Sequence, residues 1–321
     1  MIRYLKHGQI DKAAWDECVT RSLNRRVYAF SWYLDCVSPG WDGLVEDGYN
    51  SIFPLTWNRK AGINYLFQPF FTQQLGLFSK HTISHEFLKE FLDHIPSRFY
   101  YIDIHLNTEC PGSELIMQVT LRINNSLNLE LQYNEIAALY SRNTRRNLQK
   151  AEAECVNTGR NITDDDLIRL FRLNFGAREK KLRPFHYERL KKLMDEAIRR
   201  DKGEIRGAYD DQGLLSAAAF FLKDEGRIYF LFAASDPVAR ENGAMFRLID
   251  DFIREHAGNR IVLDFEGGND ADLGRFYKSF GSSEEYYFRI IINRLPFILK
   301  PGLVFVRMLR KSVKQRIFVK L

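Results

Sequence analysis

Residues 227–281 most narrowly limit the fold of this chain, because they follow the order strand, polar loop, helix, strand and short helix. An apolar run at 228–234 ends in the polar turn Ser235-Asp236-Pro237, after which the segment beginning at Arg240 is expected to open a helix. The free backbone N–H groups and the positive dipole end of a helix start bind phosphate, and Gly243 would let the anion approach closely. The pattern predicts an anion-binding loop that feeds a cleft.

Length and composition favour two domains without a metal. The 321 residues are 45% hydrophobic, which is enough for two cores. The four cysteines, at 18, 36, 110 and 155, have neither the spacing of zinc ligands nor that of a disulfide framework. No run of about 18 apolar residues occurs, and the first residues lack the apolar core of a secretory signal. We therefore expect a cytoplasmic protein, and contact with the inner membrane face stays open.

Positive charge gathers at the C-terminal end of the chain. From residue 286 onward there are nine Lys or Arg and no Asp or Glu, whereas the rest of the chain holds 38 basic and 41 acidic residues. Beyond Pro301, apolar residues fall on one side of a predicted helix, and basic residues fall mainly on the other. Such a basic amphipathic tail either packs against the body of the protein or contacts an anionic membrane surface.

Hydrophobic periodicity predicts alternating helices and strands in both halves of the chain. For the first half it predicts helices at 10–23, 28–37 and 84–95, and strands at 43–48, 49–57, 63–67 and 99–105. For the second half it predicts helices at 134–154, 163–174 and 184–200, then an antiparallel meander at 203–209, 214–223 and 228–234. Asn124-Asn125-Ser126 interrupts the apolar pattern and places a boundary nearby, so the expected domains are 1–130 and 131–295, followed by the tail 296–321.

Residues 228–281 resemble the second half of the GNAT acyltransferase fold. The cofactor loop of that family has Gln or Arg, two residues, Gly, one residue, and then Gly or Ala; here Arg240, Gly243 and Met245 hold these positions, and Met245 departs from the pattern. The resemblance implies that acyl-CoA, carrying an acetyl or longer group, binds along Arg240, Glu241, Asn242, Gly243, Ala244 and Met245. In this hypothesis the preceding strand positions the acyl group with backbone groups near Ala233 and Ala234.

A wider resemblance covers most of the chain. The basic segment 144–152 and the sequence Leu263-Asp264-Phe265-Glu266-Gly267-Gly268 are similar to those of FemAB-like proteins, in which two GNAT-like units are fused. This implies a mixed α/β fold with two tandem GNAT-like domains, each a mostly antiparallel mixed sheet flanked by helices. Tyr277, four residues before Gly281, corresponds to the GNAT tyrosine that protonates the coenzyme A thiolate. Fem peptidyltransferases have a lysine there, so Tyr277 favours an acyl-CoA donor, while the adjacent Lys278 keeps a tRNA donor open.

Several polar residues are candidates for catalysis or acceptor binding. Glu266 lies at the carboxyl end of a strand predicted at 260–265, where open α/β sheets hold their ligands, so it is a candidate general base. Asp264, two residues earlier on the same face, could orient it. A capping or solvent-facing carboxylate is the structural alternative for Glu266. The amides Gln68, Gln73 and Gln74 lie in an aromatic-rich loop and could contact the acceptor, or simply pack a turn.

Two histidine patterns are expected to be neither metal sites nor catalytic sites. His81 and His85 are four residues apart without the HExxH frame of a zinc site, and Asp103 with His105 is expected to be a structural pair. The leading hypothesis is a bacterial N-acyltransferase that moves an acyl group from acyl-CoA to an amine, either a small molecule or a peptidoglycan or lipid precursor. One alternative is aminoacyl transfer from tRNA to a cell-wall precursor, with the basic segment 140–152 and the tail contacting RNA. Another is a non-catalytic protein that binds membrane surfaces.

Overall fold

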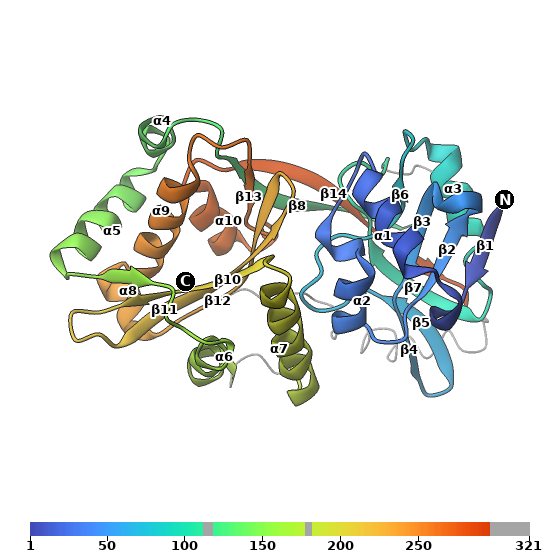
Figure 1. Ribbon diagram of the computed structural model, residues 1–321, viewed down its shortest axis with the longest axis horizontal. Coiled ribbons are helices and arrows are strands. Elements are labelled where there is room, and N and C mark those ends of the chain that lie inside the picture. The colour runs from blue at the N-terminus through green and yellow to red at the C-terminus, as the bar shows by residue number, and fades with distance from the viewer. Residues whose placement is uncertain (112–117, 177–181, 296–321) are drawn as a thin grey trace. The chain divides into compact units, whose positions relative to one another are not determined.

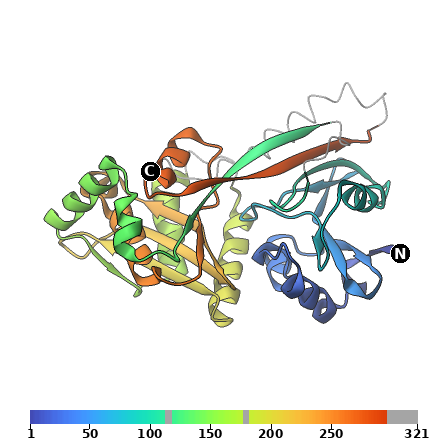
Figure 2. The ribbon, with the colours of Figure 1, turned by 90° about the horizontal axis from the view of Figure 1, so that it is seen from above.

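The computed structural model describes residues 1–111, 118–176 and 182–295, without the side chains of 175 and 176. These residues form two compact units. Unit 1 is Met1–Arg122 together with the described residues from Tyr286 onward, and unit 2 is Ile123–Glu285. The chain passes from one unit to the other within β8 (Val119–Asn128) and again within β14 (Ser283–Asn293), both seen along their length in Figure 2. The predicted tail 296–321 lies outside the described residues, and the domain limits 1–130 and 131–295 stay predictions.

Unit 1 contains two sheets. The first has the order β1 (Ile2–Leu5), β2 (Asp42–Glu46), β3 (Ser51–Leu55), β6 (Phe78–Ser79), and every neighbouring pair is antiparallel. The second is mixed, because β5 (Ile63–Phe67) pairs antiparallel with β4 (Trp57–Lys60) but parallel with β7 (Phe99–His105), which in turn pairs antiparallel with β14. The predicted hairpin around Gly48, whose φ is 72°, is confirmed as β2 and β3.

The helices of unit 1 are α1 (Lys12–Arg21), α2 (Ser31–Val37) and α3 (His85–Asp93), with short 3-10 turns at His7–Gln9, Val27–Ala29 and Asp47–Tyr49. The start of α3 follows from its sequence, since the Ser84 hydroxyl accepts the Phe87 N–H at 3.1 Å. Its Leu88, Phe91 and Leu92 are buried and belong to a core that extends to Ile290 of β14. The hydrophobic core of unit 1 is therefore completed by β14, a strand from near the C-terminal end of the described residues.

Unit 2 holds one mixed sheet in the order β8, β13 (Val262–Asp264), β12 (Arg227–Ser235), β11 (Leu215–Asp224), β10 (Gly203–Tyr209), β9 (Asn157–Gly159). The predicted meander is confirmed, because β10, β11 and β12 pair antiparallel in sequence. The predicted βαβ step is confirmed as well: α9 (Ala244–His256) connects β12 to β13, and these two strands pair in parallel.

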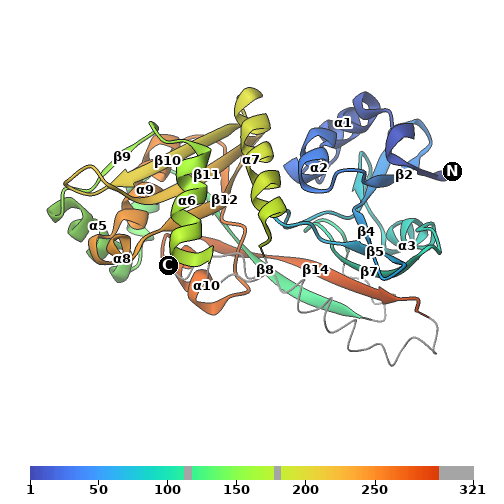
Figure 3. The ribbon, with the colours of Figure 1, turned by 90° about the horizontal axis from the view of Figure 1, so that it is seen from below.

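Helices cover both faces of the unit 2 sheet. On one side lie α9 and α10 (Ala271–Lys278), and on the other lie α6 (Asp164–Phe171), which is followed by a π-helical turn at Arg172–Gly176, and α7 (Pro184–Arg199) (Figures 1 and 3). Small side chains on β11, such as Ala217 and Ala219, let α9 approach closely, and Phe221 stacks on Phe252 with ring centroids 3.7 Å apart. Each buried aromatic or aliphatic side chain of this layer contributes about 1.5–3 kcal/mol.

The helix predicted at 134–154 is two helices, α4 (Tyr133–Ala138) and α5 (Arg142–Ala153). The break has a local cause, because the Ser141 hydroxyl accepts the Thr144 N–H at 3.1 Å and so caps a new helix. The Thr144 hydroxyl donates to the Ser279 carbonyl at 2.8 Å, which fixes the start of α5 against the chain just after α10. The sequence prediction missed this N-cap because Ser141 lies inside an otherwise helical pattern.

The polar run Asn124-Asn125-Ser126, which interrupts the apolar pattern of the sequence, lies within β8. All three side chains are buried, and they are hydrogen-bonded to groups distant in the sequence. Asn124 Nδ2 donates to Asp264 Oδ1 at 2.9 Å, Asn125 Nδ2 donates to the Gly267 carbonyl at 2.6 Å, and the Ser126 hydroxyl donates to Glu285 Oε1 at 2.8 Å. The run holds the β13 loop in place, which is why a strand accepts it.

Candidate functional site

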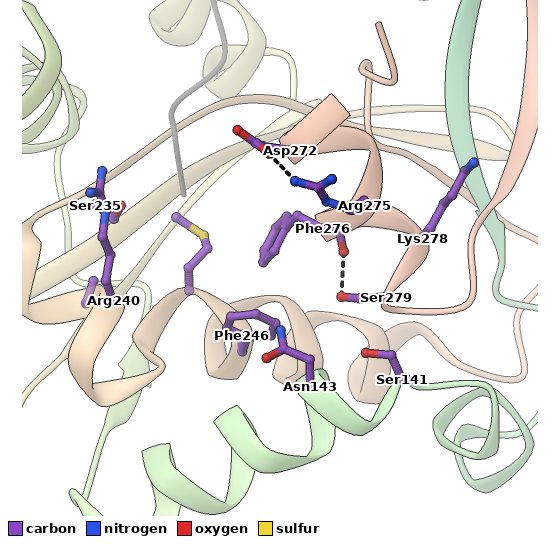
Figure 4. A pocket seen from close by; sticks show the side chains of 12 residues that line it. Ser141, Asn143, Ser235, Arg240, Phe246, Asp272, Arg275, Phe276, Lys278 and Ser279 are labelled. Atoms are coloured by element: carbon purple, nitrogen blue, oxygen red, sulfur yellow. Dashed lines mark hydrogen bonds and ion pairs between the residues drawn. The ribbon is translucent and has the colours of Figure 1, made fainter. Parts of the chain in front are cut away.

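A cavity of about 750 Å³ lies in unit 2 between α9 and α10 (Figure 4). Its wall also includes the end of β12, the short helix α8 (Pro237–Asn242) and the start of α5. Phe246 of α9 and Phe276 of α10 meet in this wall with ring centroids 5.0 Å apart, while Arg240, Arg275 and Lys278 supply cationic groups. Apolar walls with a few charged groups are typical of cofactor sites, and the volume is within the usual range.

The strands below the cavity separate from each other. Pairing of β12 with β13 is limited to Arg227–Tyr229 against Val262–Asp264, and within the described residues it ends there. On its other edge, β12 has a bulge at Leu231, because Phe230 pairs with Phe221 while Phe232 pairs with Phe220. Beyond Tyr229, β12 and β13 thus do not pair within the described residues. Neighbouring strands that separate in this way can receive an extended ligand between them through backbone hydrogen bonds.

The prediction that Arg240 opens a helix is wrong. Arg240 lies exposed in the last turn of α8. Pro237 begins this helix at its first position, which suits a residue without an N–H. Gly243 then ends α8 with a left-handed φ of 73°, and α9 begins at Ala244. Arg240 therefore comes to the cavity from α8, while Met245 and Phe246 come from the first turn of α9.

Gly243 is buried beneath α5 and does not line the cavity. A methyl group at this position would lie 2.5 Å from the Asn147 carbonyl oxygen, so the missing side chain permits close helix packing. Asn242 is buried and its Oδ1 accepts the Ala244 N–H at 3.0 Å, while Glu241 is exposed. The first turn of α9 carries no acidic residue that would oppose an anion.

The two alanines predicted to position the acyl group lie on opposite faces of β12. Ala233 belongs to the core under α9, on the cavity side of the sheet, and successive residues of a strand alternate, so Ala234 faces away. Of the predicted cofactor residues, the cavity wall thus includes Arg240 and Met245, and Ala233 lies on the same face. The binding roles of the whole set stay predictions.

The predicted catalytic residues Glu266, Tyr277 and Asp264 are not among the described residues of the cavity wall. Glu266 is 5% exposed and has a φ of 53°, a conformation that costs about 1–3 kcal/mol for a residue with a side chain. It does not cap α10, because Asp270 accepts the first N–H groups of that helix. Its own N–H donates to Asp264 Oδ1 at 2.9 Å, so Asp264 does orient the Glu266 backbone. Backbone strain at a buried carboxylate agrees with a functional role, which stays a prediction.

Asp264 is the centre of a buried polar network. Its Oδ2 pairs with the Arg227 guanidinium at 2.6 Å, and Arg227 also contacts Glu285 at 3.3 Å. With Asn124 on its other oxygen, Asp264 is fully engaged in holding β8, β12 and β13 together. These contacts give Asp264 a structural role, and its part in catalysis stays a prediction.

Tyr277 is buried in the core of unit 2, stacked on Phe265 with ring centroids 4.8 Å apart. Burial, followed by the nearby Glu266 carboxylate, raises the pKa of its hydroxyl, so the phenol keeps its proton. Gly267 makes room for the ring, since a methyl group there would lie 2.6 Å from Tyr277 Cε2. The motif around Gly267 and Gly268 is thus explained by packing, because a methyl at Gly268 would lie 2.6 Å from Asn125 Nδ2.

The predicted acceptor residues Gln68, Gln73 and Gln74 are buried in unit 1 and hold a loop. Gln68 Nε2 donates to the Thr72 carbonyl at 3.0 Å, and its Oε1 accepts the His105 N–H at 2.9 Å. Gln74 Nε2 donates to Gln73 Oε1 at 2.7 Å, and its own Oε1 accepts the Thr108 N–H at 3.1 Å. These bonds agree with the packed-turn alternative, and acceptor binding stays a prediction.

Several residues of the cavity wall were missed at the sequence level. Ser141 and Asn143 belong to a helix start that the pattern concealed, whereas Phe246 and Phe276 looked like ordinary core residues. Ser235 stood in the polar turn after the apolar run, and a hydroxyl at that position was the one available signal. In the parts of the chain that the structure describes, no three His, Cys, Asp or Glu side chains group as metal ligands, and no helix has the length and apolarity to span a bilayer.

The comparisons with known proteins agree with this geometry. Residues 140–279 match the family model of the acetyltransferase (GNAT) domain, and this segment contains every described residue of the cavity wall. The fold resembles that of FemX with a TM-score of 0.63 at 13% identity, covering 95% of this chain and 99% of that one. Residues 140–279 are therefore similar to the acetyltransferase (GNAT) domain, and the resemblance to FemAB-like proteins is confirmed at the level of the fold.

Two further structures share the fold. One is a conserved protein of unknown function from Bacteroides thetaiotaomicron VPI-5482, with a TM-score of 0.58, 12% identity, and coverage of 91% of this chain and 100% of that one. The other is the C-terminal domain of a candidate lysylphosphatidylglycerol synthetase from Agrobacterium fabrum, with a TM-score of 0.54, 10% identity, and coverage of 93% and 97%. No curated protein matches the chain.

Proposed function

We propose that this protein is an N-acyltransferase that takes an acyl group from acyl-CoA and passes it to an amine. The observation that carries this proposal is the cavity at the start of α9 inside the GNAT domain, with Arg240 in its wall. Three features suit a phosphorylated, extended donor: cationic side chains, a first turn of α9 without acidic residues, and the open edge of β12. Arg240 would hold phosphate oxygens, and the backbone of β12 would hold the extended arm.

The chain's own residues would handle the protons of the reaction. Bound acyl-CoA supplies an activated thioester, whose carbonyl carbon forms a bond to the amine nitrogen as its bond to sulfur breaks. Glu266 would accept the proton that the amine loses, directly or through water, and the protonated Tyr277 hydroxyl would donate to the leaving sulfur. Both side chains are buried and neither belongs to the described cavity wall, so these roles require that the reacting end of the donor reaches past that wall.

The acceptor is proposed as an amine on a small molecule or on a cell-wall or lipid precursor. FemX and a candidate lysylphosphatidylglycerol synthetase share the fold at 13% and 10% identity, which motivates this acceptor class. Aminoacyl transfer from tRNA is the second candidate. It is favoured by α5, whose Arg142, Arg145, Arg146 and Lys150 are exposed while its start lines the cavity.

Calorimetric titration with acetyl-CoA, and separately with charged tRNA, tests the proposal. In the proposed function, acetyl-CoA binds and Arg240→Ala weakens it by about 10- to 100-fold, since hydrogen bonds to charged groups contribute about 1.5–3 kcal/mol. The matched control is Arg145→Ala, which removes an exposed arginine that is absent from the cavity wall and should leave the acetyl-CoA affinity unchanged.

The second candidate predicts the opposite pattern. Charged tRNA would bind with an affinity that falls steeply as salt rises, Arg145→Ala would weaken it, and acetyl-CoA would not bind. If acetyl-CoA does not bind the unaltered protein, the proposed donor is wrong, and the arginine variants do not change that conclusion.

A further inference from the structure

A buried hydroxyl without a partner lies at the end of β12. Ser235 is 2% exposed, and its Oγ has no hydrogen-bond partner among the residues that the structure describes. Buried polar groups nearly always have partners, because an unpaired one loses its bonds to water without replacement. An unpaired hydroxyl that also lines a cavity is therefore available to bond to a ligand in that cavity.

The strand register shows where this hydroxyl is directed. Ser235 pairs with Ala217, and both lie on the face of the sheet that α9 covers, because Ala217 and Ala233 belong to the core under that helix. Ser235 also lines the cavity (Figure 4). The unpaired hydroxyl is thus directed to the space between α9 and α10.

Ser216 on the neighbouring strand provides an internal comparison. It is 1% exposed, and its Oγ also lacks a hydrogen-bond partner in the described part of the chain. It precedes Ala217, so it faces the opposite side of the sheet, and it is absent from the cavity wall. The two serines match in residue type, burial and strand position, and they differ in access to the cavity.

We infer that Ser235 is a binding residue whose hydroxyl donates a hydrogen bond to a phosphate oxygen of the donor's diphosphate. This rests on the proposed function and adds to it a residue that the loop pattern from Arg240 to Met245 does not include. Phosphate fits because the same wall holds Arg240, and because the carboxylate of Asp272, the acidic residue among the described lining residues, is paired with Arg275. The preceding part of β12 offers backbone groups for the arm of the donor, so Ser235, where the strand ends and α8 is about to begin, meets the part that carries the phosphates.

Calorimetry on the full chain tests this inference with two probes, coenzyme A and inorganic pyrophosphate. Ser235→Ala should weaken both by about tenfold, the loss expected for one hydrogen bond to a charged acceptor, whereas Ser216→Ala should change neither by more than about twofold. Thermal unfolding of the free variants provides a second readout. Neither should melt below the unaltered protein, because each loses an unpaired buried hydroxyl.

Each outcome decides between the two proposals. If coenzyme A binds and Ser235→Ala binds it as tightly as Ser216→Ala, the inference is wrong while the proposed function stands. If pyrophosphate binds in a Ser235-dependent way but coenzyme A does not, the inference holds and the proposed donor fails. If neither probe binds the unaltered protein, both fail. A melting temperature of Ser235→Ala well below that of Ser216→Ala would show a structural bond and overturn the inference.

Discussion

At the scale of single residues, the buried polar groups of unit 1 show how the structure uses side chains that could have been catalytic. His105 is 1% exposed, and its Nδ1–H donates to the Gln73 carbonyl at 2.9 Å. Asp103 pairs with the Arg289 guanidinium, with its Oδ1 2.6 Å from Arg289 Nε. The expectation of structural roles for Asp103 and His105 agrees with these contacts, although each bonds to a different partner.

Because the pKa of the His105 imidazole is lowered, we expect the free energy of unfolding of the protein to fall in acid. Burial, followed by the charge of Arg122, lowers its pKa to about 3, against about 6.5 in an unfolded chain. Between these values the unfolded state binds a proton and the native state does not, so the free energy of unfolding falls as pH falls. This one group should contribute a loss of about 1.4 kcal/mol per pH unit below about pH 6.

Urea unfolding at pH 7, 6 and 5 measures that slope. His105→Asn should have a shallower dependence on pH than the unaltered protein, and replacing the exposed His85 by Asn provides the matched control. Equal slopes for the unaltered protein and His105→Asn would show that this imidazole gains a proton in the native state.

At the scale of elements, the junction of α8 and α9 decides how the cavity is built. Gly243 ends one helix and begins the next in a left-handed conformation, and α5 packs directly over it. The same residue thus orients Arg240 on one side and Met245 on the other. The cavity depends on the contact between α5 and this junction as much as on the loop sequence.

Gly243→Ala should destabilise the protein by about 3 kcal/mol or more. The left-handed φ of 73° costs a residue with a side chain about 1–2 kcal/mol, and the new methyl would lie 2.5 Å from the Asn147 carbonyl oxygen. Gly226→Ala is the control, because its φ is 69° and no atom lies within 4 Å of the new methyl. Chemical denaturation of both variants separates the contact from the backbone cost, and equal losses would show that α5 can move aside.

At the scale of the whole molecule, each unit has a buried ion pair between neighbouring strands that are far apart in the sequence. Asp103 of β7 and Arg289 of β14 form the pair in unit 1, and Asp264 of β13 and Arg227 of β12 form the pair in unit 2. The aspartates are nearly inaccessible, at 2% and 1% side-chain exposure. Removing one partner of such a pair costs about 3–5 kcal/mol, because the remaining charge stays buried.

Arg289→Met and Arg227→Met should therefore loosen different parts of the molecule. Hydrogen exchange should increase mainly in the strands of unit 1 for the first variant and mainly in those of unit 2 for the second, if each unit unfolds cooperatively by itself. The same set of amides losing protection in both variants would show that the chain unfolds as a single unit.

The sequence by itself determined the features that depend on near neighbours. The hairpin at Gly48, the meander and the βαβ step were predicted, because apolar periodicity and glycine positions are local signals. The family resemblance added the loop around Arg240 and Met245, and both residues line the cavity.

Only the tertiary structure decided how the polar residues are used. In the sequence Asn124 only interrupts an apolar pattern near an expected domain boundary, and its partner Asp264 is 140 residues away. Likewise, β14 joins the core of a unit built from the start of the chain. Ser235 and Ser216 have the same residue type and burial, yet only one reaches the cavity, because strand register gives them opposite faces. Partners distant in sequence and the direction of a side chain arise when strands pair, so local pattern cannot contain them.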